Sequence, residues 1–200
     1  SLIQLATHTS GLPRNSQADY EMVASMNQWF LSGGKGEITW FPSNEKILES
    51  LGNIRLDYPA YDYLWYSSRH YSNLGYNVLG IALDRACPTS YETFVVNHIC
   101  KPLQMNSTGF ITSPKQENDI APAYWMNPET KAPVKAPFFQ PNSALYAGGM
   151  YSTARDLAKY ISFQFSHDTV LSDASKAMMY SFKIGWKPDY PFVHHQGHWS

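Results

Sequence analysis

The chain of 200 residues has few charged side chains and almost no net charge. Charged residues make up 16% of the sequence, and 15 Lys and Arg stand against 16 Asp and Glu, which gives a formal net charge of −1 at pH 7. Proteins that bind nucleic acid or an anionic membrane surface through electrostatics normally carry a clustered basic excess. The composition therefore gives no electrostatic case for either partner.

The sequence also lacks a long hydrophobic segment and a recognisable signal peptide. A helix that crosses a bilayer needs about 20 predominantly apolar residues in a row, so we expect no membrane span in this chain. The first residues continue an apolar segment and the last are Trp199 and Ser200. We therefore expect a part of a longer protein, and the missing signal peptide says little about its compartment.

Cysteine is scarce, with only Cys87 and Cys100 present. Their spacing matches no metal-binding pattern, and the sequence leaves open whether they form one disulfide or two unpaired core thiols. His194, His195 and His198 lie close together but without a nearby set of Cys or carboxylate ligands. We therefore expect no metal site, and nothing in the sequence calls for a cofactor.

What the sequence does contain is typical of a globular enzyme-sized domain. Apolar residues make up 44%, and the 14 Tyr and 6 Trp could line a cleft or pack in the core. Hydrophobic periodicity predicts helices that begin near residues 16, 43, 73, 90, 153 and 172. Short strands are expected at residues 38–41 and 192–195, and irregular structure at residues 109–111 and 114–141. The apolar stripe expected to be buried on the helix after Thr153 consists of Leu157, Tyr160, Ile161 and Phe165.

Residues 71–73, with the sequence Tyr-Ser-Asn, place a phenol and a carboxamide directly before a predicted helix. In extended backbone, the side chains of Tyr71 and Asn73 point the same way. A phenol beside a cation can lose its proton below its usual pKa of about 10 and act as a general base. The amide can bind a carbonyl or orient a lysine. Taken alone, such a short motif is more often a buried Tyr and a turn-forming Asn, because three-residue motifs recur by chance.

Five segments in the same order resemble the serine β-lactamase and penicillin-binding-protein superfamily, above all its class C branch with the related esterases and D-aminopeptidases. They are Leu-Ala-Thr-His-Thr-Ser-Gly-Leu-Pro at 5–13, Tyr-Ser-Asn-Leu-Gly-Tyr at 71–76, and the segments 99–110, 147–157 and 195–197. Their order and spacing agree over essentially the whole chain. The resemblance implies an α+β protein of the β-lactamase/transpeptidase-like fold. Residues 1–200 would form part of one such domain, mostly its helical lobe plus the start of the active-site sheet.

The resemblance also implies a serine hydrolase that works through an acyl-enzyme on an ester, amide or lactam. Tyr71 would serve as general base and then acid, and Asn73 would bind the substrate carbonyl and orient the lysine. His195 would hold the substrate or tune Tyr71. Gly197 would permit close backbone approach, and the N–H of His198 would form half of the oxyanion hole. A His where dedicated β-lactamases favour Lys suggests esterase or peptidase relatives.

The nucleophile is the chief departure from the family pattern. The Ser-x-x-Lys match at residues 43–46 lies after the segment at 7–13 and resembles a helix cap, so we reject it on position. We expect the nucleophilic Ser upstream of Ser1, and we expect these 200 residues alone to be inactive. A second departure is at residues 59–70, where Pro-Ala and a long aromatic stretch replace the usual Pro-Gly.

Two other interpretations remain. The first is a catalytically inactive homologue that binds a ligand or partner through the same cleft, and the weaker one is a structural helical domain. A Ser-x-x-Lys motif upstream would separate the hydrolase from the inactive homologue. The expected partner is a small-molecule or peptide-like substrate. The sequence leaves the oligomeric state open, and only the family suggests a secreted or periplasmic protein. His8 is expected to hold a turn, and His194 to point away from the cleft.

Overall fold

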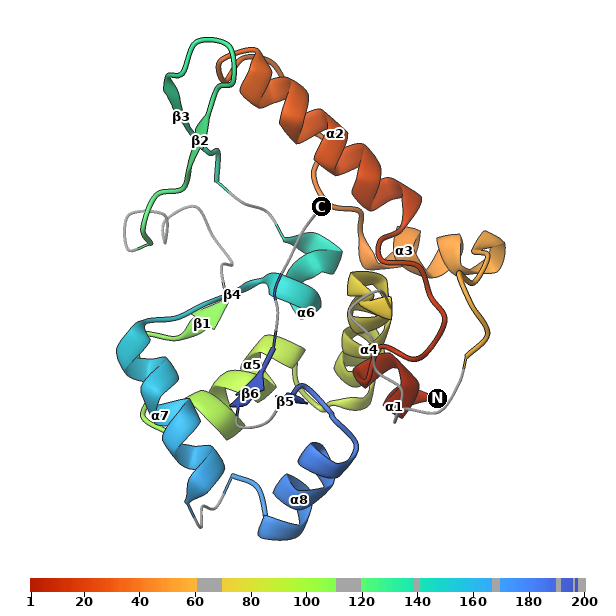
Figure 1. The fold of residues 1–200 in the computed structure, drawn as a ribbon, viewed down its shortest axis with the longest axis vertical. Coiled ribbons are helices and arrows are strands. Elements are labelled where there is room, and N and C mark those ends of the chain that lie inside the picture. The colour runs from red at the N-terminus through yellow and green to blue at the C-terminus, as the bar shows by residue number, and fades with distance from the viewer. Residues whose placement is uncertain are drawn as a thin grey trace.

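The structure is a computed structural model that describes residues 1–60, 70–110, 120–138, 141–166, 170–189, 192–195 and 197. Helices dominate it (Figure 1). They are α1 (Leu2–Ala6), α2 (Gln17–Leu31), α3 (Asn44–Ser50), α4 (Asn73–Ala86), α5 (Tyr91–Val95), α6 (Leu145–Gly148), α7 (Ala154–Phe165) and α8 (Asp173–Ser181), with the 3-10 turns η1 (Leu51–Asn53) and η6 (Asn142–Ala144) and the π-helix η4 (Val96–Cys100).

The described strands are short and pair in three antiparallel ribbons. They are β1 (Gly109–Phe110) with β4 (Met150–Tyr151), β2 (Tyr124–Met126) with β3 (Pro133–Lys135), and β5 (Lys187–Asp189) with β6 (Phe192–His194). Helices together with antiparallel ribbons give an α+β chain, as predicted from the sequence.

Side-chain caps start the helices at the predicted positions. The hydroxyl of Ser16 accepts a hydrogen bond from the N–H of Asp19, whose carboxylate in return accepts one from the N–H of Ser16 at 2.8 Å. This reciprocal pair satisfies two backbone donors that a helix start otherwise leaves unpaired. Helices α3, α5, α7 and α8 are capped by one such bond each, in which the side-chain oxygen of Ser43, Ser90, Thr153 or Ser172 accepts from the N–H three residues on. The prediction that Ser43 is a helix cap is confirmed.

Helix α4 is the centre of the N-terminal half of the fold. It contacts α1, α3 and α6 (Figure 1). Its buried Leu74 and Ile81 pack with Ile47 of α3, and all three side chains are almost fully removed from water. Burying an aliphatic side chain contributes about 1.5–3 kcal/mol, so this cluster fixes the position of α4 and of the residues that precede it.

Three secondary-structure predictions were wrong because contacts distant in sequence decided the outcome. Residues 38–41 form no strand, since the N–H of Thr39 donates to the hydroxyl of Ser25 on α2 instead. Residues 109–110 were expected to be irregular but pair with β4. The stretch from residue 114 to 141 contains the hairpin β2–β3, which lies beside the end of α2 (Figure 1). There, the ring of Trp125 stacks on Phe30 at 5.0 Å between centroids.

Three of the four residues predicted to form the buried stripe on α7 are exposed. Leu157, Ile161 and Phe165 are 50%, 53% and 82% exposed, whereas Asp156 and Phe163 are buried. The carboxylate of Asp156 accepts hydrogen bonds from the N–H of Ser107 at 2.7 Å and the hydroxyl of Thr108 at 3.0 Å. These bonds turn α7 so that Phe163 packs into the core in place of Leu157, Ile161 and Phe165, while the fourth predicted residue, Tyr160, is partly buried against the same cluster.

The two cysteines are both free thiols, which settles the alternative that the sequence left open. Cys100 is buried within the cluster that includes Met105 and Phe110, and burial raises the pKa of its thiol. The aromatic stretch that departs from the family pattern lies largely outside the described residues, because residues 61–69 are not among them.

Gly80 of α4 provides a test of this packing. A Cβ at Gly80 would overlap Cβ and Cγ of Tyr146 on α6, atoms that cannot swing away as a side-chain tip could. Gly80→Ala should therefore lower the free energy of unfolding by about 2 kcal/mol, although alanine alone favours the helix by about 1 kcal/mol. The matched control is Gly52→Ala in η1, where an added Cβ meets no atom within 4 Å. Urea unfolding should show the control within about 0.5 kcal/mol of the parent. Equal stabilities for both variants would contradict the close contact of α4 and α6.

Candidate active site

The segment of residues 8–15 holds the Tyr-Ser-Asn motif through backbone hydrogen bonds. The hydroxyl of Ser72 donates to the carbonyl of Pro13 at 2.6 Å and accepts from the N–H of Gly75 at 2.8 Å, so it also caps α4. The carbonyl of Arg14 accepts from the N–H of Asn73 at 2.8 Å and from that of Leu74 at 3.2 Å. Each net bond is worth about 1 kcal/mol. Together they join two segments about 60 residues apart, and Ser72 is an anchor of the motif as well as a spacer.

Gly11 allows this segment to turn tightly. Its backbone has a φ of +80°, a conformation that non-glycine residues rarely adopt, and an added Cβ would overlap the carbonyl oxygen of Tyr58. The carbonyl of Gly11 accepts a hydrogen bond from the N–H of Asp57 at 2.9 Å. The turn at residues 7–13 is therefore packed against a third segment of the chain.

Tyr71 is half-buried, and its ring lies under the guanidinium of Arg14, with 5.2 Å from the Arg14 Cζ to the ring centroid. Burial raises the pKa of Tyr71 above its usual value, and the positive charge of Arg14 offsets only part of that rise. The sequence-based expectation was a phenol whose pKa a nearby cation lowers. Among the described residues the balance is the opposite, because desolvation of the phenolate outweighs one cation placed over the ring face.

Asn73, the first residue of α4, is almost fully buried. Its amide nitrogen donates to Oδ1 of Asn15 at 2.9 Å, and Asn15 is equally buried. Asn73 was predicted from the sequence to have a role in the site, whereas its partner Asn15 was not. The only indication in the sequence was the position of Asn15 directly before the helix cap Ser16, which does not reveal a partner 58 residues away.

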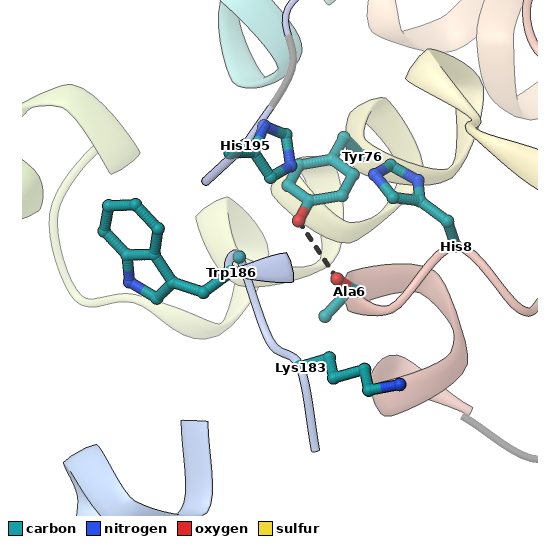
Figure 2. A pocket seen from close by; sticks show the side chains of 7 residues that line it. Ala6, His8, Tyr76, Lys183, Trp186 and His195 are labelled. Atoms are coloured by element: carbon teal, nitrogen blue, oxygen red, sulfur yellow. Dashed lines mark hydrogen bonds between the residues drawn. The ribbon is translucent and has the colours of Figure 1, made fainter. Parts of the chain in front are cut away.

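His195 follows β6 and lies beside the motif. Its ring centroid is 6.0 Å from that of Tyr71, 6.1 Å from that of His8 and 6.4 Å from that of Tyr76. Figure 2 shows His195 facing Tyr76 and His8, with the hydroxyl of Tyr76 directed at the carbonyl oxygen of Ala6, 3.0 Å away. The structure therefore brings His195 close to Tyr71 from a distant segment, while the amide of Asn73 lies buried against Asn15.

Of the other residues named at this end of the chain, the structure describes His194 and Gly197 but not His198. His194 is half-buried at the end of β6, paired in register with Lys187. Gly197 is exposed, two residues past His195. His198, whose N–H was predicted to form half of an oxyanion hole, lies outside the described residues.

A small pocket opens beside this cluster (Figure 2). It is lined by Ala6, His8, Tyr76, Lys183, Gly185, Trp186 and His195 and offers about 10 Å³, close to the space that one water molecule needs. Within the described residues, no group of three His, Cys, Asp or Glu side chains could hold a metal ion. Among the described residues, no helix is long and apolar enough to cross a membrane.

Comparison with curated proteins finds relatives much longer than this chain. It is 32% identical over 174 residues to beta-lactamase-like protein 2 of Dictyostelium discoideum, a match that covers 86% of this chain and 28% of that protein. It is 27% identical over 184 residues to D-alanyl-D-alanine-carboxypeptidase/endopeptidase AmpH of Escherichia coli K12, which covers 90% and 41%. The chain thus spans less than half the length of these relatives.

Solved structures share the fold. D-amino acid amidase from Ochrobactrum anthropi SV3 superimposes with a TM-score of 0.65 at 23% identity, over 94% of this chain and 48% of that one. The octameric penicillin-binding protein homologue from Pyrococcus abyssi gives 0.61 at 24% identity, over 88% and 36%. Identities this low show the fold alone, and that fold is the β-lactamase/transpeptidase-like fold predicted from the sequence.

The family itself is shown by a profile of the beta-lactamase family, which matches residues 1–198. That span includes the turn at residues 7–13, the Tyr-Ser-Asn motif and the histidine that the structure places beside it. With a match over nearly its whole length, this chain belongs to the beta-lactamase family.

Proposed function

We propose that the protein containing this chain is a serine hydrolase that forms an acyl-enzyme with an ester, amide or lactam. The observation that carries the proposal is that His195 lies beside Tyr71, which Asn73 follows by two residues in the same motif. These are the side chains that the family resemblance assigns to proton transfer, carbonyl binding and substrate binding. The ring centroids of Tyr71 and His195 lie 6.0 Å apart although 124 positions separate the two residues in the sequence. The names of the relatives, which include a carboxypeptidase and an amidase, also support a hydrolase.

In this mechanism the hydroxyl of a Ser in an upstream Ser-x-x-Lys segment attacks the substrate carbonyl. Tyr71 takes the proton of that hydroxyl and later returns a proton to the leaving group. Because burial raises the pKa of Tyr71 in this chain, Arg14 alone does not favour the phenolate. The ammonium of the upstream lysine would supply the second positive charge that a phenolate needs.

The substrate class follows from His195 and from the relatives. A dedicated β-lactamase would be expected to carry a fixed cation at this place, whereas an imidazole changes its charge near neutral pH. Relatives are named as a carboxypeptidase/endopeptidase and as a D-amino acid amidase. We therefore propose an ester or an amide of a small or peptide-like molecule in preference to a lactam.

Covalent labelling of the full-length protein tests the acyl-enzyme. The protein is treated with a serine-directed fluorophosphonate and, separately, with a β-lactam, and the modified peptide is identified by mass spectrometry. We expect one adduct, on a Ser upstream of this chain. Ser43→Ala is the control, and it should label like the parent because Ser43 is a helix cap. An adduct on Ser43 would contradict the proposed nucleophile, and no adduct with either reagent would favour the inactive homologue.

A further inference from the structure

We infer that His8 is a positioning residue for Tyr71, because its ring accepts a hydrogen bond from the N–H of Ser72 and packs against the rings of Tyr71 and Tyr76. The inference rests on the proposed function, in which Tyr71 transfers the proton. From its sequence, His8 was expected only to hold a turn. Its contacts in the structure reach the motif itself.

The backbone of His8 adopts a conformation that favours another residue type. Two backbone hydrogen bonds close the C-terminal end of helix α1. The N–H of Thr9 donates to the carbonyl of Gln4 at 2.9 Å, and the N–H of His8 donates to the carbonyl of Leu5 at 3.4 Å. This helix end needs a left-handed residue, usually Gly, and His8 occupies it with a φ of +58°. Residues other than glycine are uncommon at a positive φ, although histidine is found there more often than most. What His8 contributes beyond a glycine at this helix end is therefore its side chain.

That contribution is visible in the contacts of the His8 ring, which is 3% exposed. Its centroid lies 4.3 Å from the ring of Tyr71 and 4.8 Å from the ring of Tyr76. Its Nδ1 accepts the N–H of Ser72 at 3.1 Å. Ser72 directly follows Tyr71, so this bond fixes the peptide that carries the phenol while the ring contact fixes its plane.

The hydrogen bond also sets the charge state of His8. An imidazole that accepts at Nδ1 carries its proton at Nε2 and is neutral. A second proton, on Nδ1, would place an N–H directly against the N–H of Ser72, and neither group could accept a hydrogen bond from the other. The groups that face the ring are Arg14, Tyr71, Tyr76 and His195. Burial, and then the positive charges of His195 and Arg14, lower the pKa of His8 to about 3. His8 therefore stays neutral through the range in which a histidine such as His195 titrates, and its loss should change the rate without moving the pH profile.

Two substitutions in the full-length protein test whether the hydrogen-bond acceptor of His8 is needed or only the volume of its side chain. In His8→Asn, Oδ1 can stand where Nδ1 was, and Asn tolerates a positive φ. In His8→Gln, the acceptor lies one methylene farther away. Both remove the ring. We expect kcat per folded molecule to fall by roughly tenfold in His8→Asn and by roughly a hundredfold in His8→Gln, with KM within about threefold of the parent, because small misplacements of a reacting group are costly. If His8→Gln does not fold, His8→Gly takes its place.

A second measurement distinguishes this inference from the proposed function. The ring of Tyr71 is followed by NMR with ¹³C-labelled tyrosine, assigned with Tyr71→Phe. We expect the Tyr71 resonance to move in His8→Gln more than in His8→Asn, while the other tyrosines stay in place apart from Tyr76. If the parent is inactive but the resonance moves, the proposed function fails and the positioning role stands. An unmoved resonance, or kcat per folded molecule equal to the parent in both variants, would overturn the role of His8.

Discussion

Tyr71→Phe in the full-length protein should lower kcat by about a hundred- to ten-thousand-fold, the usual loss when a general acid–base group is removed. The substitution deletes the hydroxyl that carries the proton and leaves the ring. The contacts of that ring with His8, at 4.3 Å between centroids, and with the guanidinium of Arg14 can remain. We therefore expect the melting temperature to change little, and the loss of activity to come from chemistry.

Tyr76→Phe is the matched control for this measurement. Tyr76 also contacts His8, and its ring lies 6.4 Å from His195, so its surroundings resemble those of Tyr71. Its hydroxyl, however, donates to the carbonyl of Ala6. Losing that bond should cost about 1 kcal/mol of stability and leave kcat within a few-fold of the parent. If Tyr71→Phe turns over normally, or simply unfolds, Tyr71 is a packing residue and the base lies elsewhere.

Local chemistry explains which features could be predicted from the sequence. The caps at Ser16, Ser43 and Thr153 depend on side chains that reach only three residues along the chain, and the sequence displays such pairs directly. The motif at residues 71–73 was also visible, because its extended segment and the helix after it are local. These predictions needed no knowledge of the partners of each segment.

The features that were missed depend on pairs far apart in sequence. Asn15 meets Asn73 across 58 positions, and His8 meets Ser72 across 64. In α7 the buried carboxylate of Asp156, bound by the loop at residues 107–108, decided which face turns inward. Hydrophobic periodicity alone cannot detect a polar anchor of this kind, because an unpaired buried carboxylate would be far costlier than an exposed leucine.

Replacement of His195 by Lys should remove a limb of the pH–rate profile in the full-length protein. His195 is exposed, with its ring 6.0 Å from that of Tyr71. Histidine titrates near neutral pH, with a reference value of about 6.5. A protonated His195 would favour the phenolate of Tyr71, whereas a neutral one could only donate or accept a hydrogen bond. We therefore expect kcat/KM to carry a limb in this range, and its direction identifies the active form.

A lysine at position 195 stays charged across that range, so His195→Lys should flatten the limb and retain part of the activity. A fixed cation should also favour substrates that bear a carboxylate, because the two charges can pair. The matched control is His194→Ala, which should keep the limb, since adjacent residues at a strand end point to opposite sides. His8 cannot produce the limb, because burial and its charged neighbours lower its pKa to about 3. A limb that persists in His195→Lys and disappears in His194→Ala would show that the other histidine faces Tyr71.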